Sequence, residues 1–272
     1  MAEELRSALH AAAREQGADL FGVAPIGRFD GVEPAHHPAS VFPETRSVVV
    51  VGKRIVRGCL RGVEEGTQFD LYNQYARNWV PNRFLALMTV AVASFLEDRR
   101  HEAVPLPELA PETPPMGVPV GPGKPAPNVT VDFADAAVRA GLGEIGLMGL
   151  LMTPAFGPLQ RVQLVLTDAE LEPTPAGEAT VCDRCGACAA ACPLGAIDAH
   201  ATREVVIGGR RMPVAEIDES LCRSCRNGAQ PNAYHPAGPP DRLAAACMRV
   251  CVQHLQERSE ERRVGKECAT GC

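Results

Sequence analysis

The sequence predicts an α+β fold, in which an α/β domain is followed by a small cysteine-rich domain. Two observations lead to this fold class. Helix-like segments alternate with short β-branched runs in the first part of the chain, and eight clustered cysteines all follow residue 181. We therefore expect domains at residues 1–177 and 178–257, separated close to the segment EPTPAGE at residues 172–178, which is typical of a linker.

Composition restricts the classes of protein. Of the 272 residues, 46% are hydrophobic and 22% charged, which disfavours disorder and coiled coil. The net charge of −6 does not suggest a nucleic-acid surface, so nucleic acid is not an expected partner. The acidic start lacks a signal-like apolar run, and the apolar stretch at 84–96 is short of the roughly 20 residues of a membrane span. We expect a cytoplasmic protein without a membrane segment, in which clustered cysteines indicate metal binding.

The first elements are a helix and two strands. Apolar residues at helical spacing predict a helix over residues 3–16, and Gly17 is placed to end it. Residues 19–25 (DLFGVAP) and 47–51 (SVVVV) are predicted strands; the second is strongly enriched in β-branched residues. These strands should form part of a buried sheet.

A long helical region follows at residues 70–100. Phe84, Met88, Ala91 and Phe95 trace one apolar face, which we expect to pack in the core.

The remainder of the first domain is interrupted by a proline-rich segment. Residues 105–127 contain nine prolines, which predicts a long loop without strand or helix. A short helix is expected at 132–140, a glycine-rich stretch covers 141–158, and residues 160–167 (QRVQLVLT) are a further predicted strand.

The first cysteine run reads CDRCGACAAACP. Cys182, Cys185 and Cys188 are separated by two residues each, and Cys192 follows after three and precedes a proline. This is the bacterial ferredoxin spacing, in which three thiolates hold one cubane cluster and the fourth reaches another cluster. A tetrahedral zinc site instead uses paired CxxC knuckles.

A second cysteine set supplies the partner cluster. Cys222 and Cys225 are followed, after a 21-residue insertion, by Cys247 and Cys251. We assign two [4Fe–4S] clusters, the first held by Cys182, Cys185, Cys188 and Cys251 and the second by Cys192, Cys222, Cys225 and Cys247. The alternative is zinc in the second set, which would leave Cys192 without a metal. Between the two sets, residues 205–214 are a predicted hairpin that would space the cluster loops.

Three glycines match a nucleotide-binding fingerprint. Gly141, Gly143 and Gly146 fit G-x-G-x-x-G, but the motif follows a helix-like stretch and not a strand, which argues against dinucleotide binding. We expect these glycines to let the backbone pass close to a cofactor or to the cluster domain.

The last fifteen residues are set apart. Residues 258–268, RSEERRVGKEC, resemble a translated short-read sequencing adapter, although a charged helical end has the same composition. We expect 258–272 to be an artefactual tail and a natural C-terminal segment to be missing. Without the tail's Cys268 and Cys272, nine of the eleven cysteines remain, and only Cys59 stands outside the two sets.

Four stretches carry a resemblance to a known family. They are FPETRSVVV at 42–50, AGLGEIG at 140–146, LTD at 166–168 and CDRCGACAAACPLGAI from residue 182. Together they resemble epoxyqueuosine reductases, which are relatives of the corrinoid reductive dehalogenases. The resemblance implies a nitroreductase-like α/β domain for a base-off cobalamin, joined to a two-cluster ferredoxin-like domain. Electrons would then pass from a low-potential ferredoxin or flavodoxin type of donor through both clusters to the cofactor.

The chain also departs from that family. Epoxyqueuosine reductases carry a catalytic aspartate about a dozen residues before the AGLG stretch, whereas Asp132 and Asp135 lie closer, and Glu144 stands where the family has tryptophan. The chain looks more like a shorter ferredoxin-tailed branch common in anaerobes, so the catalytic residues are unassigned.

Three functions are considered. The first is an iron–sulfur oxidoreductase that passes electrons to cobalamin, another cofactor or a small-molecule substrate in the first domain. The alternatives are a non-enzymatic electron carrier or activator for a partner protein, and an epoxyqueuosine reductase acting on tRNA. The large first domain favours an enzyme.

Overall fold

A computed structural model describes residues 1–109, 116–177, 180–232 and 238–270, with side chains up to residue 259. Part of the proline-rich segment (110–115), the predicted domain start at residue 178, and the side chains of residues 260–272 in the expected tail lie outside the described residues.

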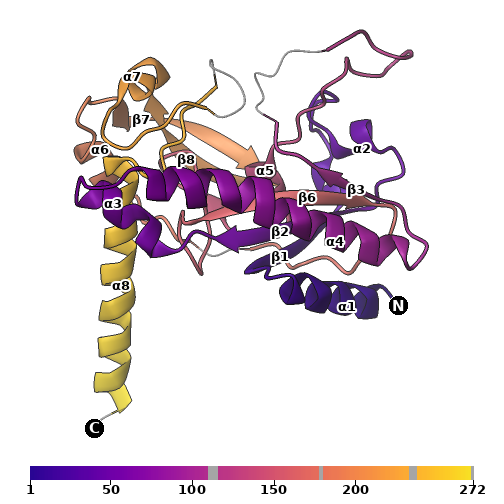
Figure 1. Cartoon of the computed structure of the whole chain (residues 1–272), viewed down its shortest axis with the longest axis horizontal. Coiled ribbons are helices and arrows are strands. Elements are labelled where there is room, and N and C mark those ends of the chain that lie inside the picture. Colours follow the sequence, from indigo (N-terminus) through magenta and orange to yellow (C-terminus); the bar gives the residue numbers. More distant parts are fainter. Residues whose placement is uncertain (110–115, 178–179, 233–237, 271–272) are drawn as a thin grey trace.

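A four-stranded antiparallel sheet forms the centre of the molecule (Figure 1). Its strand order is β1-β2-β6-β3, and β2 pairs with β6 from Ser47 opposite Thr167 to Arg54 opposite Gln160. The strands are β1 (Leu20–Pro25), β2 (Ser47–Arg54), β3 (Ala103–Leu106) and β6 (Gln160–Thr167). The three predicted strands are present, and the mixed α and β fold class is confirmed.

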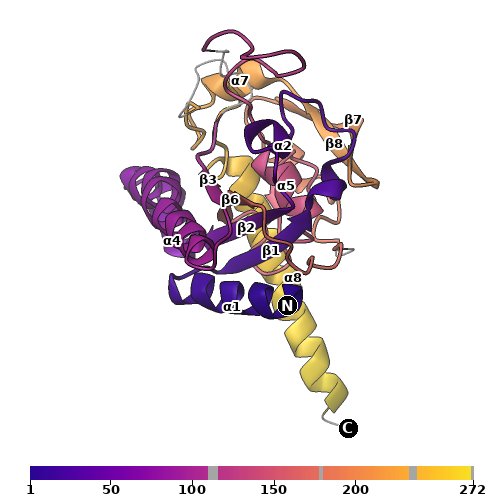
Figure 2. The ribbon, with the colours of Figure 1, turned by 90° about the vertical axis from the view of Figure 1, so that its right-hand side faces the viewer.

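Helices cover both faces of this sheet (Figure 2). Because side chains alternate along a strand, Val49 and Val51 face α1 (Ala2–Glu15) and α4 (Ala86–Glu97), whereas Val48 and Val50 face α5 (Phe133–Arg139). All four valines are fully buried, which explains why β2 is a continuous apolar run.

The long helix differs from its sequence prediction in its buried face. Residues Tyr72–Leu85 (η3) are π-helical and continue directly into α4. The core contacts come from Leu85, Met88, Val92 and Leu96, while Phe84 is 44% exposed, so the predicted core position of Phe84 was wrong. The physical reason is that π-helical turns close i to i+5 hydrogen bonds, so the α-helical spacing read from the sequence does not hold there.

The same helix bears on membrane association. Tyr72–Glu97 is a continuous helix of 26 residues that is long and apolar enough to cross a membrane, judged by length and composition alone. The core helix of a soluble protein can meet the same two criteria. Less than half of its most apolar window is buried inside the molecule. The expected absence of a membrane segment and the cytoplasmic location stay predictions.

Part of the proline-rich segment is a strand. Pro105 lies in β3 opposite Val165, so the prediction that no strand includes residues 105–127 was wrong at its first residues. β3 is an edge strand, so one of its sides has no neighbouring strand. Proline, which lacks a backbone N–H, is tolerated in such a strand.

The cysteine region, residues 180–259, packs on one end of this layered body. Its hairpin is longer than predicted and turns at Gly208 and Gly209, both of which have positive φ. The Ala215 N–H donates to the Leu147 carbonyl at 2.8 Å, which ties the hairpin to the glycine-rich stretch. The elements of this region are α6 (Ala187–Ala190), β7 (Ile197–Ile207), β8 (Arg210–Ile217), α7 (Glu219–Ser224) and α8 (Ala246–Thr270), whose far end extends away from the body (Figure 1).

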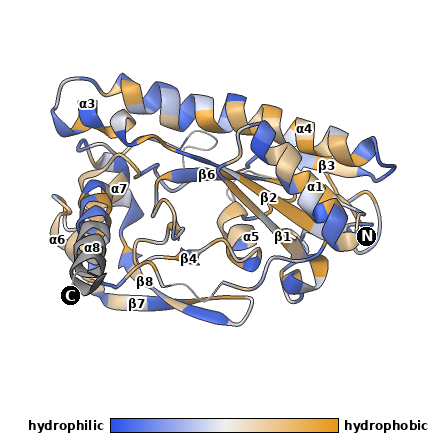
Figure 3. Cartoon of the chain, turned by 90° about the horizontal axis from the view of Figure 1, so that it is seen from below, coloured by the Kyte–Doolittle hydropathy of each residue, from blue (hydrophilic) through white to orange (hydrophobic). Residues whose placement is uncertain are grey.

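Shorter elements complete the described chain. They are η1 (Ile26–Phe29), α2 (Pro38–Val41), η2 (Arg57–Leu60), α3 (Arg61–Glu64) and the two-stranded pair β4 (Glu144–Ile145) and β5 (Leu151–Met152). Figure 3 shows β4 and α5 between the long helix on one side and the β7–β8 hairpin on the other.

Candidate functional site

Four thiols of the predicted first set line one pocket. Cys182 and Cys185 come from the loop that enters α6, Cys188 lies in α6, and Cys251 comes from α8. Loop residue Arg184 has left-handed backbone geometry, with φ at 59°. The other walls are mainly apolar side chains, namely Leu147, Met148, Leu150, Met152, Met248 and Leu255. Cys188 is buried, whereas Cys185 is exposed to solvent.

The other four thiols come from three places in the chain. Cys192 follows α6, Cys222 and Cys225 end α7, and Cys247 begins α8. Their proximity shows in their electrostatics: burial raises the pKa of Cys222, and negative charge on Cys192 and Cys225 raises it further. The two sets are neighbours, because Cys188 also acts on the pKa of Cys247.

The thiols are costly to ionise before a metal binds. Burial first, and then the neighbouring cysteines, raise the pKa of Cys247 to about 11 and that of Cys251 to about 12. A metal centre would have to displace these protons and supply the counter-charge.

Backbone donors point at several sulfurs. The N–H groups of Leu147, Ala196 and Asn227 lie 3.5, 3.3 and 3.4 Å from the sulfurs of Cys182, Cys192 and Cys225, respectively. Hydrogen bonds to cysteine sulfur are among the features that set the potential of iron–sulfur clusters. No disulfide joins any of the nine described cysteines.

The three fingerprint glycines lie against the protein's own backbone. A Cβ atom on Gly141 would approach the Pro175 carbonyl to 2.1 Å, and one on Gly143 would approach the Met152 carbonyl to 2.1 Å. At Gly146 it would approach the Met152 sulfur to 2.2 Å and would lie at an ordinary contact distance, 3.6 Å, from Cβ of Cys182. Close packing against Pro175 and Met152 therefore requires glycine here, and Gly146 also lies beside Cys182, while contact with a cofactor stays a prediction.

Glu144 is a site residue that sequence reasoning missed. Its carboxylate is 5% exposed; one oxygen accepts the backbone N–H groups of Val181 and Cys182 at 2.6 and 2.7 Å. The other oxygen pairs with Arg210 of β8 at 2.7 Å. The signal was available, since a glutamate interrupts an otherwise apolar glycine-rich stretch.

Asp132 and Asp135 have structural partners. Asp132 caps α5 by accepting the N–H groups of Ala134 and Asp135, and the Asp135 carboxylate pairs with Arg139. Burial raises the pKa of Asp135, although its hydrogen bond with Arg139 opposes this. The Asp135 side chain is therefore held in an ion pair and is not a free general acid.

A cavity of about 480 Å³ lies between the sheet and the cysteine region. We call it the central cavity; its walls come from η3, β6, α5, β8 and residues 239–243, the end of the insertion between Cys225 and Cys247. Its size is in the range of small-ligand pockets.

A buried polar network lies in the wall of this cavity. The Arg161 guanidinium donates to Asp241 at 2.5 Å and to the Tyr72 hydroxyl at 3.1 Å, and that hydroxyl donates to Asp241 at 2.8 Å. Burial raises the pKa of Tyr72 well above its ordinary value of 10, which Arg161 only partly offsets. Burial also opposes ionisation of Asp241, but Arg161 and the Tyr72 hydroxyl outweigh it and lower its pKa. Asp241 is therefore an anion at neutral pH.

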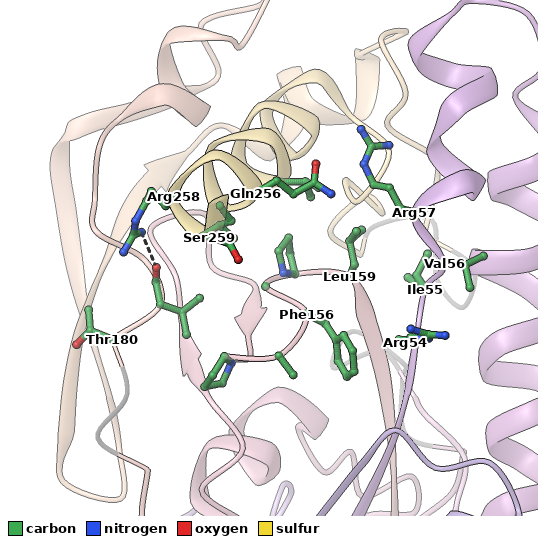
Figure 4. A pocket seen from close by; sticks show the side chains of 17 residues that line it. Arg54, Ile55, Val56, Arg57, Phe156, Leu159, Thr180, Gln256, Arg258 and Ser259 are labelled. Carbon is green, nitrogen blue, oxygen red and sulfur yellow. Dashed lines mark hydrogen bonds between the residues drawn. The ribbon is translucent and has the colours of Figure 1, made fainter. Parts of the chain in front are cut away.

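A larger pocket of about 1120 Å³ opens beside α8 (Figure 4). Its charged side chains already have partners: Arg57 pairs with Glu64 at 2.6 Å, and Arg258 pairs with Asp183 at 3.1 Å and donates to the Val181 carbonyl. Arg258, which sequence analysis assigned to the tail, thus contacts the start of the cysteine region.

The side chains of Asp183, Cys185 and His254 also lie close together. Their possible metal-ligand atoms are within 4.8 Å of one another.

The fold was compared with solved structures and with protein-family models. Solved structures that resemble this chain include reductive dehalogenases and epoxyqueuosine reductases, so the resemblance predicted from sequence is confirmed. No protein-family model matches the chain.

Particular relatives are as follows. A catabolic reductive dehalogenase in complex with 3-bromo-4-hydroxybenzoic acid has a TM-score of 0.59 at 16% identity, over 92% of this chain and 34% of that one. A reductive dehalogenase whose structure suggests a mechanism for B12-dependent dehalogenation has a TM-score of 0.56 at 17% identity, over 82% and 29%. Epoxyqueuosine reductase from Bacillus subtilis has a TM-score of 0.51 at 16% identity, over 71% and 52%.

Sequence relatives cover a short segment. Tetrachloroethene reductive dehalogenase from Desulfitobacterium hafniense is 46% identical over 76 residues, which is 27% of this chain and 14% of that protein. The enzyme of the same name from Sulfurospirillum multivorans is 42% identical over 64 residues, or 22% and 13%. The chain thus spans about one seventh of the length of these relatives.

Proposed function

We propose that the protein is an iron–sulfur oxidoreductase that holds two [4Fe–4S] clusters and delivers electrons to an acceptor in the central cavity. The observation that carries this proposal is the gathering of four free thiols in one pocket, next to a second set of four whose charges act on one another and on Arg242 of the cavity wall. The donor set fits cubane clusters, because the first set lines one largely apolar pocket and backbone N–H groups approach three sulfurs.

The proposed ligands are those expected from the sequence. Cys182, Cys185, Cys188 and Cys251 would hold one cluster, and Cys192, Cys222, Cys225 and Cys247 the other. When bound, the clusters supply one-electron transfer at low potential. The chain supplies the sulfurs, excludes water around the buried ones, and holds the Cys182 loop through Glu144.

The two sets have different surroundings, which indicates a direction of electron flow. Cys185 is exposed, so the first set offers an edge for a low-potential donor protein of the ferredoxin or flavodoxin type. Cys222 and Cys247 feel the positive charge of Arg242, which lines the central cavity. The second set is therefore the one from which electrons reach the acceptor.

The acceptor in this proposal is a corrinoid or a small molecule. A corrinoid is supported by the similarity in fold to the dehalogenase associated with B12-dependent chemistry. A non-enzymatic carrier is less favoured because the sheet and the cysteine region together form a cavity for which a carrier has no use.

Anaerobic purification with iron and sulfide reconstitution tests the clusters. We expect a brown protein with about eight iron atoms per chain and electron paramagnetic resonance (EPR) signals of two interacting clusters on reduction. A colourless protein with one zinc ion in the second set would reject the assignment. Titration with cobalamin, followed by its absorption spectrum before and after reduction, tests the corrinoid; no binding at high cobalamin concentration leaves a small-molecule acceptor.

A further inference from the structure

The long helix formed by η3 and α4 exposes an apolar face. Leu87 and Val90 are 71% and 55% exposed, and Phe84 and Tyr75 are each 44% exposed. Trp79 lies between these two aromatic rings, with ring centroids 5.2 Å from Tyr75 and 6.3 Å from Phe84. The helix runs along the outer edge of the molecule (Figures 2 and 3). Exposed apolar side chains gathered on one helix indicate an interaction surface.

The α4 part of this face has a regular arrangement of large and small residues. Leu87, Val90, Ala91 and Ser94 follow one another at three- or four-residue spacing, so they share one face of the helix, and Phe84 continues it. We call these five residues the exposed stripe; the residues of α4 that contact the core lie on the other side of the helix. Phe84 and Leu87 are large and stand towards one end of the stripe, whereas Ala91 and Ser94 are small and stand towards the other. The stripe is therefore complementary in shape to a reversed copy of itself.

The charges that flank the stripe are opposite at its two ends. Arg83 precedes it and Glu97 follows it, and both side chains are exposed. Within the described part of the chain neither of them has an ion-pair partner. Arg83 lies over the Trp79 ring, 4.8 Å from its centroid, and Arg99, the cation closest to Glu97 in sequence, lies over Phe95 instead. Each end of the stripe thus offers a charge that the other end of a second copy would match.

We propose that two copies of this chain pair through the exposed stripe, with their α4 helices antiparallel and the two-fold axis at Val90. Val90 then meets its own counterpart, Leu87 of one copy lies opposite Ser94 of the other, and Arg83 reaches Glu97, because each of these pairs is spaced about evenly around Val90. An interface with two-fold symmetry uses the same patch on both copies and has to be self-complementary, as this stripe is. A lipid surface would not use the opposite charges at the two ends. The inference is independent of the proposed function.

Sedimentation velocity of the reconstituted full-length protein between about 1 and 100 μM tests the pairing. One helix from each copy makes a small interface, so we expect a dimer with a dissociation constant on the order of micromolar. Val90→Glu sets two carboxylates against each other at the two-fold axis and should weaken the dimer by at least about 100-fold. The matched control is Val206→Glu on β7, because Val206 is 53% exposed and lies outside the stripe; this variant should dimerise as the wild type does.

A charge exchange tests the antiparallel arrangement. Arg83→Glu and Glu97→Arg should each weaken the dimer by about 10-fold, and the double variant should regain most of the affinity. A protein that is monomeric at every concentration overturns the proposal, and so does a dimer that Val90→Glu leaves intact or that the double variant does not restore.

Vesicles of phosphatidylcholine and phosphatidylglycerol probe the other occupant of such a face. A monomer that sediments with these vesicles, and no longer does so as Val90→Glu, assigns the stripe to a membrane surface and overturns the pairing. Iron content and cluster EPR are recorded on the same samples, so a loss of the clusters, which would contradict the proposed function, is seen separately from a loss of dimerisation.

Discussion

The Glu144 carboxylate accepts the backbone N–H of Cys182 at 2.7 Å, which joins the glycine-rich stretch to the first proposed cluster ligand. The same carboxylate accepts the Val181 N–H and pairs with Arg210 on the hairpin. One buried side chain therefore holds three segments of the site in register.

Replacing Glu144 tests whether its contacts hold these three segments together. Glu144→Ala leaves Arg210 without its carboxylate and two N–H groups without an acceptor, so we expect a loss of about 3–5 kcal/mol in the free energy of unfolding. Glu144→Gln keeps an acceptor oxygen and should cost less. Urea unfolding measures the stability, and iron content should fall more in the alanine variant.

The matched control is a second glutamate–arginine pair at the same distance. Glu204 pairs with Arg211 at 2.7 Å, but both side chains are about half exposed or more. Glu204→Ala should cost about 0–1 kcal/mol, the usual value of a surface pair. If both alanine variants lose the same small amount, Glu144 does not hold the site together.

Much of the local structure could be read from the sequence. The valine run of β2 and the capped helix α5 were predicted within a few residues, because β-branched content and helical spacing act locally. The prediction failed at Phe84 and at Pro105, where the determining facts were a π-helical stretch and an edge position in the sheet. Neither is encoded by spacing alone.

Some residues of the candidate site could be recognised from the sequence, and others could not. The first cysteine run was recognised because cluster ligands follow a short-range pattern, and the structure places Cys251 in one pocket with that run, while ligation of clusters by the two sets stays a prediction. Arg242 and Asp241 could not be found, since they lie in an insertion that the sequence pattern presented only as a spacer. Their role depends on contacts with Met148 and Arg161, which are distant along the chain.

Single-ligand variants should remove one cluster at a time. Cys185→Ser and Cys225→Ser each delete one proposed ligand, one from each set, so each is expected to lower iron content by about half. The EPR signal of the reduced protein should then simplify to that of one cluster. Cys59→Ala is the control, because Cys59 belongs to neither set and is buried in a different apolar cluster, around Leu60, so it should leave the iron content unchanged.

The outcome that contradicts this grouping is a cross-over. If Cys251→Ser abolishes the same EPR signal as Cys225→Ser, and not the signal lost in Cys185→Ser, then the thiols are divided differently between the two clusters.

Arg242 should also tune the cluster beside the cavity. Its positive charge acts on Cys222 and Cys247, and a nearby cation favours the more negative, reduced state of a cluster. Arg242→Gln is expected to lower the potential of that cluster by roughly 60 mV, which for one electron corresponds to a tenfold change in the equilibrium. An EPR-monitored redox titration measures it; an equal shift of both clusters, or none, would argue against the assignment of Arg242 to the second set.

Asp241 should contribute strongly to stability. Its side chain is 11% exposed and serves Arg161, so Asp241→Asn removes the anion of a buried pair. We expect a loss of about 3–5 kcal/mol in the free energy of unfolding. The control is Asp98→Asn at the exposed end of α4, where the change should stay within about 0.5 kcal/mol.

The pH dependence of that loss follows from the lowered pKa of Asp241. Because the folded protein binds this proton less tightly than the unfolded chain, whose aspartate pKa is 3.8, the stabilisation is complete above that value and is lost as the pH falls through the folded pKa. The difference between wild type and Asp241→Asn should therefore be constant between about pH 8 and 5 and narrow only below about pH 4. Urea unfolding of both proteins at several pH values measures it. A difference that already shrinks between pH 7 and 5 would mean that Asp241 titrates with a raised pKa, and that burial outweighs Arg161.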